Sequence, residues 1–200
     1  MKIQNTFFKK TLVVLAMSAG LFNLPAHATT VNIGASVTVN NTINVAFTPM
    51  NLGTISATKD DAAGAEIATM VLSPNPATAP VATNGATSDA TMVVLSAGSP
   101  ATVTVSGAAS NYALAVTLPT VAVTLSDPAA ASADTFTLDT FTKYATTEGN
   151  NQTFGTTTDA TGNLVFNVGA TLKTVANGAA PKDLYDETTY TGTFAVTVSY

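Results

Sequence analysis

The end of the chain alternates apolar and small polar side chains over its last twelve residues, Thr189 to Tyr200. Successive residues of a β-strand point to opposite faces of a sheet. One predicted face carries Tyr190, Phe194, Val196, Val198 and Tyr200, and the other carries Thr191, Thr193, Thr197 and Ser199. A period of two therefore predicts a strand that packs on a core through one face and offers its backbone N–H and C=O groups to neighbouring strands.

The same alternation recurs in short segments along the chain, and no window has sustained helical periodicity. Besides the terminal segment, strands are predicted at Val31–Val39, Ile43–Phe47, Leu52–Ile55, Ile67–Leu72, Thr91–Leu95, Ala101–Val105, Tyr112–Leu118, Val121–Leu125, around Phe136 and Leu138 with Phe141 as a further candidate, and at Leu164–Val168. About ten short strands with turn signals every 8–12 residues predict an all-β fold, an antiparallel β-sandwich with immunoglobulin-like or Greek-key connections. A closed barrel is the alternative, because alternation does not reveal whether a sheet closes.

Long polar stretches separate some of these strands and are predicted to be loops. Ser73–Asp89 contains three prolines, which lack the N–H that a strand ladder needs, so we predict a surface loop there. Glu148–Gly162 is a second predicted polar loop, and Gly178–Asp186 is the last loop before the terminal strand.

The N-terminus has the order of a secretory signal peptide. Three lysines precede an apolar run from residue 12 to 22, which is shorter than the roughly 20 residues that cross a bilayer. Ala26 and Ala28 give the small-residue pattern that signal peptidase reads, so cleavage is predicted after Ala28; an uncleaved membrane anchor is the alternative. Residues 1–28 are thus a predicted signal peptide, and residues 29–200 a single domain exported to the periplasm, the cell surface or the medium.

The predicted mature chain is acidic, with four Lys, no Arg and twelve Asp or Glu, a net charge of −8. A chain without a basic stripe cannot hold a phosphate backbone, so we expect no nucleic-acid partner. The same charge would be repelled by an anionic membrane surface, and no later segment is long and apolar enough to be transmembrane. Cysteine is absent, so stability has to come from packing and strand pairing.

The residues that common catalytic sites need are missing from the predicted mature chain. His27 lies in the predicted signal and no other histidine is present, which excludes Ser-His-Asp and Cys-His sites and the typical zinc site. Paired carboxylates would still suit a glycosidase. The candidate acids lie in predicted loops, where surface charge is the expected role: Asp60, Asp61, Asp159, Asp183, Asp186 and Glu187. We therefore predict a protein that is not an enzyme and has no metal and no cofactor.

Two further patterns have a ligand-binding interpretation and a simpler one. Asp159–Asn163 has oxygen ligands suited to calcium but lacks EF-hand spacing, so a turn helped by Gly162 is expected. Five tyrosines could stack on sugars, yet they are dispersed and tryptophan is absent, so packing on a core or sheet face is expected. We also expect the ring of Tyr200 to cap an open end of the sandwich.

The first segment of the predicted mature chain is the strongest functional candidate. Val31, Ile33, Val37 and Val39 form an alternating apolar face of the kind that strand addition uses. Residues 29–47 are either the first strand of their own sheet or a strand donated to a neighbouring subunit, and head-to-tail donation would build a filament. The predicted strand-pairing surface comprises these four residues and Gly192, Phe194, Val196, Val198 and Tyr200.

Five motifs together resemble a known family, the secreted bacterial domain-of-unknown-function family 4402. They are Asn51–Ile55, Ala101–Gly107, Asn111–Pro119, Phe166–Leu172 and Tyr190–Tyr200. The last, Tyr-x-Gly-Thr-Phe-x-Val-Thr-Val-x-Tyr, is the most specific. The resemblance implies an exported domain of Gram-negative bacteria and assigns no chemistry.

The chain is also similar, more loosely, to chaperone-usher pilins, which are incomplete β-sandwiches completed by a neighbour's strand. Export, composition, an alternating N-terminal segment and a terminal strand ending in tyrosine are shared. The chain departs from that pattern because it has no disulfide, because Tyr200 is last and not penultimate, and because Gly192 lies nearer the end. The similarity implies self-association or related subunits, with a periplasmic chaperone and usher as further partners.

These observations favour a non-enzymatic, pilin-like structural protein that contributes to an extracellular fibre or surface layer and so to cell adhesion. The alternative is a monomeric periplasmic or surface module that recognises glycan or another ligand through the loops Ser73–Asp89 and Glu148–Gly162. A hydrolase that uses loop carboxylates is a more distant third hypothesis.

Overall fold

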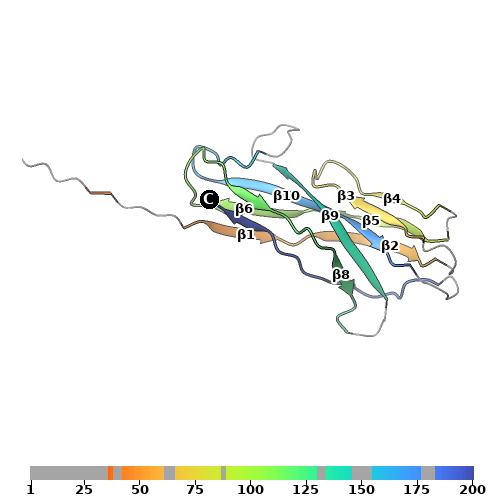
Figure 1. Cartoon of the computed structure of the whole chain (residues 1–200). Helices are drawn as coiled ribbons and strands as arrows, with labels where there is room; N and C mark the ends of the chain where they lie inside the picture. Colours follow the sequence, from red (N-terminus) through yellow and green to blue (C-terminus); the bar gives the residue numbers. More distant parts are fainter. Residues whose placement is uncertain are drawn as a thin grey trace, which may run out of the picture. The chain divides into compact units, whose positions relative to one another are not determined.

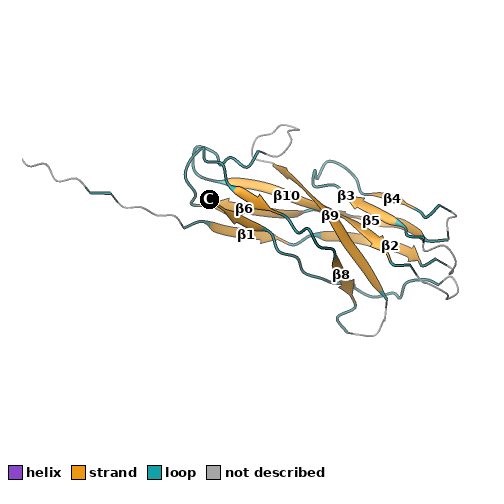
Figure 2. Cartoon of the chain, in the orientation of Figure 1, coloured by secondary structure: helices purple, strands orange, loops and turns teal. Residues whose placement is uncertain are grey.

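The computed structural model describes residues 36–37, 42–60, 66–86, 89–129, 134–145, 155–176 and 183–200. The chain falls into two units, Met1–Val39 and Asn40–Tyr200, and the strands of the described residues lie in the second. Within the described residues the strands are β1 (Asn44–Thr48), β2 (Asn51–Thr58), β3 (Thr69–Leu72), β4 (Val81–Thr83), β5 (Thr91–Ser99), β6 (Ala101–Ser106), β7 (Ala115–Thr117), β8 (Val123–Ser126), β9 (Thr135–Ala145), β10 (Leu164–Thr174) and β11 (Thr197–Ser199). All pairings are antiparallel, and no helix is drawn among the described residues (Figure 2).

The main sheet has seven strands and is organised around β10 (Figure 1). Along one edge β10 pairs first with β6, which pairs with β1, and then with β3, which pairs with β4. Its other edge pairs with β9, which pairs with β8. The position of β10 follows from its sequence, because its alternate residues are apolar from Leu164 to Leu172 and all of these are buried.

Two paired strands of the main sheet, β1 and β6, are continuous in sequence with the two strands of a second sheet, β2 and β5. The strand β1 continues into β2 and β5 continues into β6, and β2 pairs with β5 just as β1 pairs with β6. The register is unbroken where the sheets meet, since Thr48 lies opposite Thr102 and Asn51 lies opposite Ser99. Pro49 and Pro100 stand at this corner, where a missing N–H costs no ladder hydrogen bond.

The buried side chains form two clusters, one toward each end of β10. In the first, residues of β3, β8, β9 and β10 pack with Ala57 of β2 and Met92 of β5. In the second, residues of β6 and β10 pack with Leu114, and half-buried residues of β7 and the C-terminal segment close over them. The two-stranded sheets β2–β5 and β7–β11 therefore each contribute to a core shared with the main sheet.

The predicted all-β, antiparallel class is confirmed, with eleven strands in the described residues where about ten were expected. The predicted loop Ser73–Asp89 was wrong in part, because β4 lies within it and pairs with β3. Pro80 immediately precedes β4, a position at which proline does not interrupt a strand. The predicted terminal strand is shorter than expected, since ladder pairing is confined to β11 and an isolated bridge joins Thr191 to Ser126.

Candidate functional site

The strand β1 has an apolar face that its own domain leaves open. Val45 lies opposite Val105 and Phe47 opposite Val103 in the β1–β6 ladder, so the four side chains share one face of the sheet. The two β6 residues are buried, with exposed fractions of 0% and 5%, whereas Val45 is 49% and Phe47 is 75% exposed. The same face of the sheet is therefore buried in the core at β6 and open to solvent at β1.

The strand β1 is exposed because β7 and the C-terminal segment, which cover the second cluster, do not extend over Val45 and Phe47. Val116 of β7 and Val196 and Val198 of the C-terminal segment pack on the cluster that contains Val103 and Val105. Ile43, just before β1, still packs against that cluster, but Val45 and Phe47 are not members of it. In the described part of the chain, β1 pairs with β6 alone, so its second edge carries no strand.

The predicted C-terminal site residues lie along this second cluster. Phe194, Val196 and Val198 are half-buried against it, while the threonines and serine between them are exposed, as the alternation predicted. The Tyr200 ring packs edge-on against Tyr112 with a centroid distance of 5.4 Å, and it is 43% exposed.

Gly192 lies where this segment crosses β8. A Cβ atom on Gly192 would stand 2.6 Å from Leu125 Cδ2 and 2.7 Å from the Thr124 carbonyl oxygen. The close approach therefore requires a residue without a side chain, so Gly192 has a packing role within its own domain.

The predicted N-terminal site residues are described at one position. The side chain of Val37 is 86% exposed, while Val31, Ile33 and Val39 lie outside the described residues. Sequence reasoning assigned residues 29–47 to one candidate segment but did not single out Val45 and Phe47. Their alternation with Asn44, Ala46 and Thr48 was the available signal; their exposure could not be foreseen, because it depends on which strand covers them.

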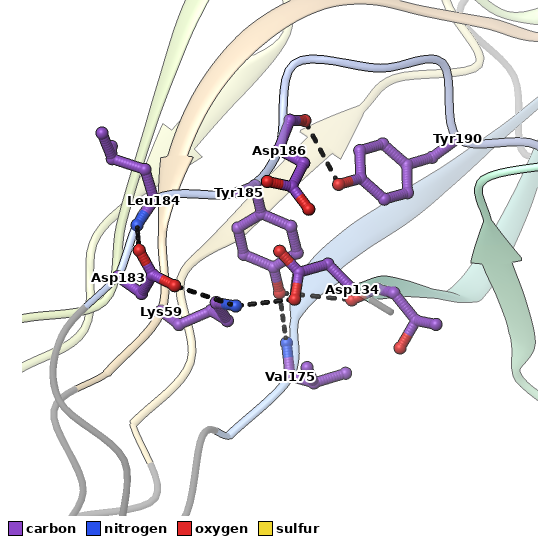
Figure 3. A network of polar contacts seen from close by, with 9 residues as sticks. Lys59, Asp134, Val175, Asp183, Leu184, Tyr185, Asp186 and Tyr190 are labelled. Atoms are coloured by element: carbon purple, nitrogen blue, oxygen red, sulfur yellow. Dashed lines mark hydrogen bonds and ion pairs between the residues drawn. The ribbon is translucent and has the colours of Figure 1, made fainter. Parts of the chain in front are cut away.

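A polar network joins four segments, around Lys59, Asp134, Val175 and Tyr185, near the end of the domain where the first cluster lies (Figure 3). Lys59 Nζ lies 2.6 Å from Asp134 Oδ1 and 3.8 Å from Asp183 Oδ2, and its side chain is 11% exposed. The Lys59 ammonium also stands 5.6 Å from the centre of the Tyr185 ring. Burial lowers the pKa of Lys59 and its contacts with Asp134 raise it, with a net increase.

Tyr185 anchors the loop that precedes the C-terminal segment. Its hydroxyl accepts a hydrogen bond from the Val175 N–H at 3.0 Å and donates one to the Thr135 carbonyl at 3.2 Å. The ring stacks on Phe136 with a centroid distance of 4.1 Å. Burial raises the pKa of the Tyr185 hydroxyl to about 12. The network is a set of structural contacts that fasten the segment 183–190 to β2 and β9, rather than an arrangement with an open reacting group.

Lys143 occupies a core-facing position of β9, opposite Val168. Its ammonium donates a hydrogen bond of 3.0 Å to the Val116 carbonyl in β7. Because burial disfavours the charged form, the pKa of Lys143 is lowered. The side chain thus ties β9 to the small sheet that covers the second cluster.

The loop acids differ in their surroundings. Asp60 was expected at the surface and is instead buried, 2% exposed, with its carboxylate accepting a hydrogen bond from the Glu66 N–H at 2.8 Å. The Asp159 carboxylate accepts hydrogen bonds from the Asn163 N–H at 2.9 Å, from the Thr161 hydroxyl at 2.7 Å and from the Thr161 N–H at 2.8 Å, and these bonds lower its pKa. Gly162 has a φ of 80° in the same turn, so the expected turn at Asp159–Asn163 is confirmed.

The comparison with protein families identifies the class to which this fold belongs. Residues 66–200 match the model of a domain of unknown function, DUF4402. The chain belongs to this family, as the sequence motifs predicted. Comparison with curated proteins and with solved structures gave no match. Nowhere in the described residues is there a helix long and apolar enough to cross a membrane.

Proposed function

We propose that the protein is an exported, non-enzymatic structural subunit that assembles into an extracellular fibre or surface layer by β-strand pairing. One observation carries the proposal. Val45 and Phe47 of β1 are exposed, although they lie on the face of the sheet that is buried in the core at the adjacent strand β6. An edge strand with an open apolar face invites pairing with another chain, and monomeric proteins usually protect such edges with charge, proline or a covering loop. The strand β1 contains no charged residue and no proline.

The sequence supports the same proposal independently. The predicted signal peptide would take the chain across the inner membrane, which is the first step that an extracellular fibre subunit needs. Thr29–Asn40 alternates apolar and polar residues and contains no charge, so a second strand-like segment would be available next to β1. Since a chain that offers one strand and accepts another joins head to tail, the assembly would grow as an open filament. A chaperone and usher would then be the expected partners in export.

Assembly is tested by comparing the predicted mature chain with a variant that lacks Thr29–Asn40. We expect the mature chain, expressed with its neighbouring genes, to form fibres in electron micrographs and ladders on unboiled gels, and the truncated chain to remain monomeric. A mature chain that forms neither would contradict the proposal. A fully assembled truncated variant would show that assembly does not need this segment.

A further inference from the structure

The open edge of β1 is matched by a particular segment of sequence. In β1 the apolar residues Val45 and Phe47 alternate with Asn44, Ala46 and Thr48, which lie on the opposite face. In Thr29–Asn40 the apolar face carries Val31, Ile33, Val37 and Val39, and the polar residues between them include Asn32, Ser36 and Thr38. A strand with this pattern, laid beside β1, would extend the apolar face of the sheet with apolar residues and the polar face with polar ones.

Neither strand would have to desolvate a charge, because both are uncharged. The segment is also long enough. Residues 31–39 would span about 30 Å as a strand, more than the five residues of β1 require. The side chains of Val45 and Phe47 would gain apolar neighbours on their open side, and the free N–H and C=O groups of β1 would gain partners.

The segment lies only a few residues before β1 in the sequence. This short separation helps to decide whether the segment pairs with β1 of its own molecule or of a neighbouring one. Residues 40–43 alone separate Val39 from the first residue of β1. To cover its own β1 the segment would have to reverse its direction within these four residues. Reaching a neighbouring molecule needs no reversal.

We infer that the free edge of β1 is the acceptor for residues 31–39 of a second copy of this chain. The inference rests on the proposed function and names the two surfaces through which it would operate. Each subunit extends its own segment to one neighbour and receives, on β1, the segment of the other. Val45 and Phe47 become buried in this arrangement.

The absence of cysteine makes disulfide trapping a direct test. Full mature chains that carry one cysteine on the donor, at Val31, Ile33, Val37 or Val39, would each be mixed under mild oxidation with a chain of different mass that carries Phe47→Cys. At least one donor position is expected to give a heterodimer on non-reducing gels, several-fold more abundant than with Asn32→Cys, Ser36→Cys or Thr38→Cys. Ala46→Cys, on the opposite face of β1, is the matched acceptor control, and mass spectrometry of the linked peptides identifies the pair.

Equal linkage at the apolar and polar donor positions would overturn the inference. A further chain would carry both Val37→Cys and Phe47→Cys; if it forms the disulfide only within itself while the mixed single-cysteine chains form none, the segment folds back on its own β1 and the inference is also overturned. Predominant Phe47→Cys homodimers would indicate pairing between two β1 strands instead. Electron microscopy of the same samples separates the two proposals: fibres without the expected linkage would leave the structural role intact and refute the acceptor, whereas the absence of both would refute both.

Discussion

Tyr185 is the central residue of the polar network, since its hydroxyl and its ring contact several of the other members. It is 9% exposed, stacks on Phe136, and joins Val175 to Thr135 through its hydroxyl. The sequence predicted a packing role for the tyrosines, and Tyr185 has that role. It could not predict the two backbone partners, because Thr135 and Val175 are distant in sequence and meet only when β9 and β10 pair.

Replacing Tyr185 with Phe removes the hydroxyl and leaves the Val175 N–H and the Thr135 carbonyl without this partner. We expect the free energy of unfolding, measured by urea denaturation, to fall by about 1–2 kcal/mol. Tyr112→Phe is the control, because the Tyr112 side chain is 45% exposed, and its change should stay within about 0.5 kcal/mol. Equal effects of the two substitutions would contradict the account of Tyr185.

The raised pKa of Tyr185 predicts a dependence of stability on pH. The hydroxyl has a pKa of about 12 in the folded protein and about 10 in an unfolded chain, so the folded state keeps its proton to higher pH. This contribution is fully present below pH 10 and is lost between about pH 10 and 12. Urea titrations across this range should show the stability advantage of the wild type over Tyr185→Phe shrinking as pH rises. An advantage that stays constant would contradict the assignment, and Tyr112→Phe should show no such trend.

At the scale of elements, β9 depends on an irregularity in its pairing with β10. Asp139 lies opposite Thr171 and Thr142 opposite Gly169, so the register shifts between them, and Thr140 has a φ of 50°. The extra residue resets the alternation, which is why Phe141 packs on both buried clusters although it lies three residues after Leu138. A β-branched residue is strained in this left-handed region.

Thr140→Gly should relieve that strain. We expect the free energy of unfolding to rise by about 1 kcal/mol, as the relief exceeds the entropy cost of glycine. The matched control is Thr137→Gly, at a regular position of the same strand, which should lower stability by about as much. Thermal or urea unfolding measures both, and a Thr140→Gly variant as unstable as Thr137→Gly would refute the interpretation.

Local patterns predicted most elements but not how they join. The alternation of β6, β8 and β10 is visible in sequence, and all three strands overlap the predicted segments. The strand β8 begins two residues later than predicted, and β10 continues six residues beyond Val168. The strand β9 was predicted around Phe136 and Leu138, with Phe141 as a further candidate, and it continues to Ala145. The irregularity at Thr140 breaks the period of two, so the pattern could not show how far the strand runs. The strand β4 was missed for another reason, since three residues after a proline-rich stretch carry too little pattern and are held by pairing with β3.

At the scale of the whole molecule, long-range pairing decides which apolar residues remain accessible. The sequence marks Val45 and Phe47 as apolar members of a strand, as it does Val103 and Val105. The β6 pair is buried and the β1 pair is exposed, because β7 and the C-terminal segment extend over β6 and do not extend over β1. Nothing local to β1 encodes where that covering layer ends. The sequence therefore limited the candidate site to the segment 29–47, and the structure identified Val45 and Phe47 as its exposed side chains.

An unsatisfied strand edge also predicts a response to added peptide. A synthetic peptide matching Thr29–Asn40 should raise the thermal midpoint of a chain that lacks this segment, because a ligand that binds the folded state alone stabilises it. At one hundred times its dissociation constant, the gain would be about 2.7 kcal/mol. A peptide of the same composition with its alternation broken is the control. A midpoint unaffected by either peptide would contradict strand acceptance by the domain.

The register that stays unbroken around the corner, from the β1–β6 ladder to the first pairs of the β2–β5 ladder, has a mechanical consequence. Tension drawn through the N-terminal end of β1, along the strand axis, would load the rungs between β1 and β6 together, in shear, instead of peeling them apart one by one. Because the ladder continues around the corner into β2 and β5, the load would pass into the next sheet without crossing a loop. Because the chain has no cysteine, this resistance would rest on hydrogen bonds and side-chain packing alone.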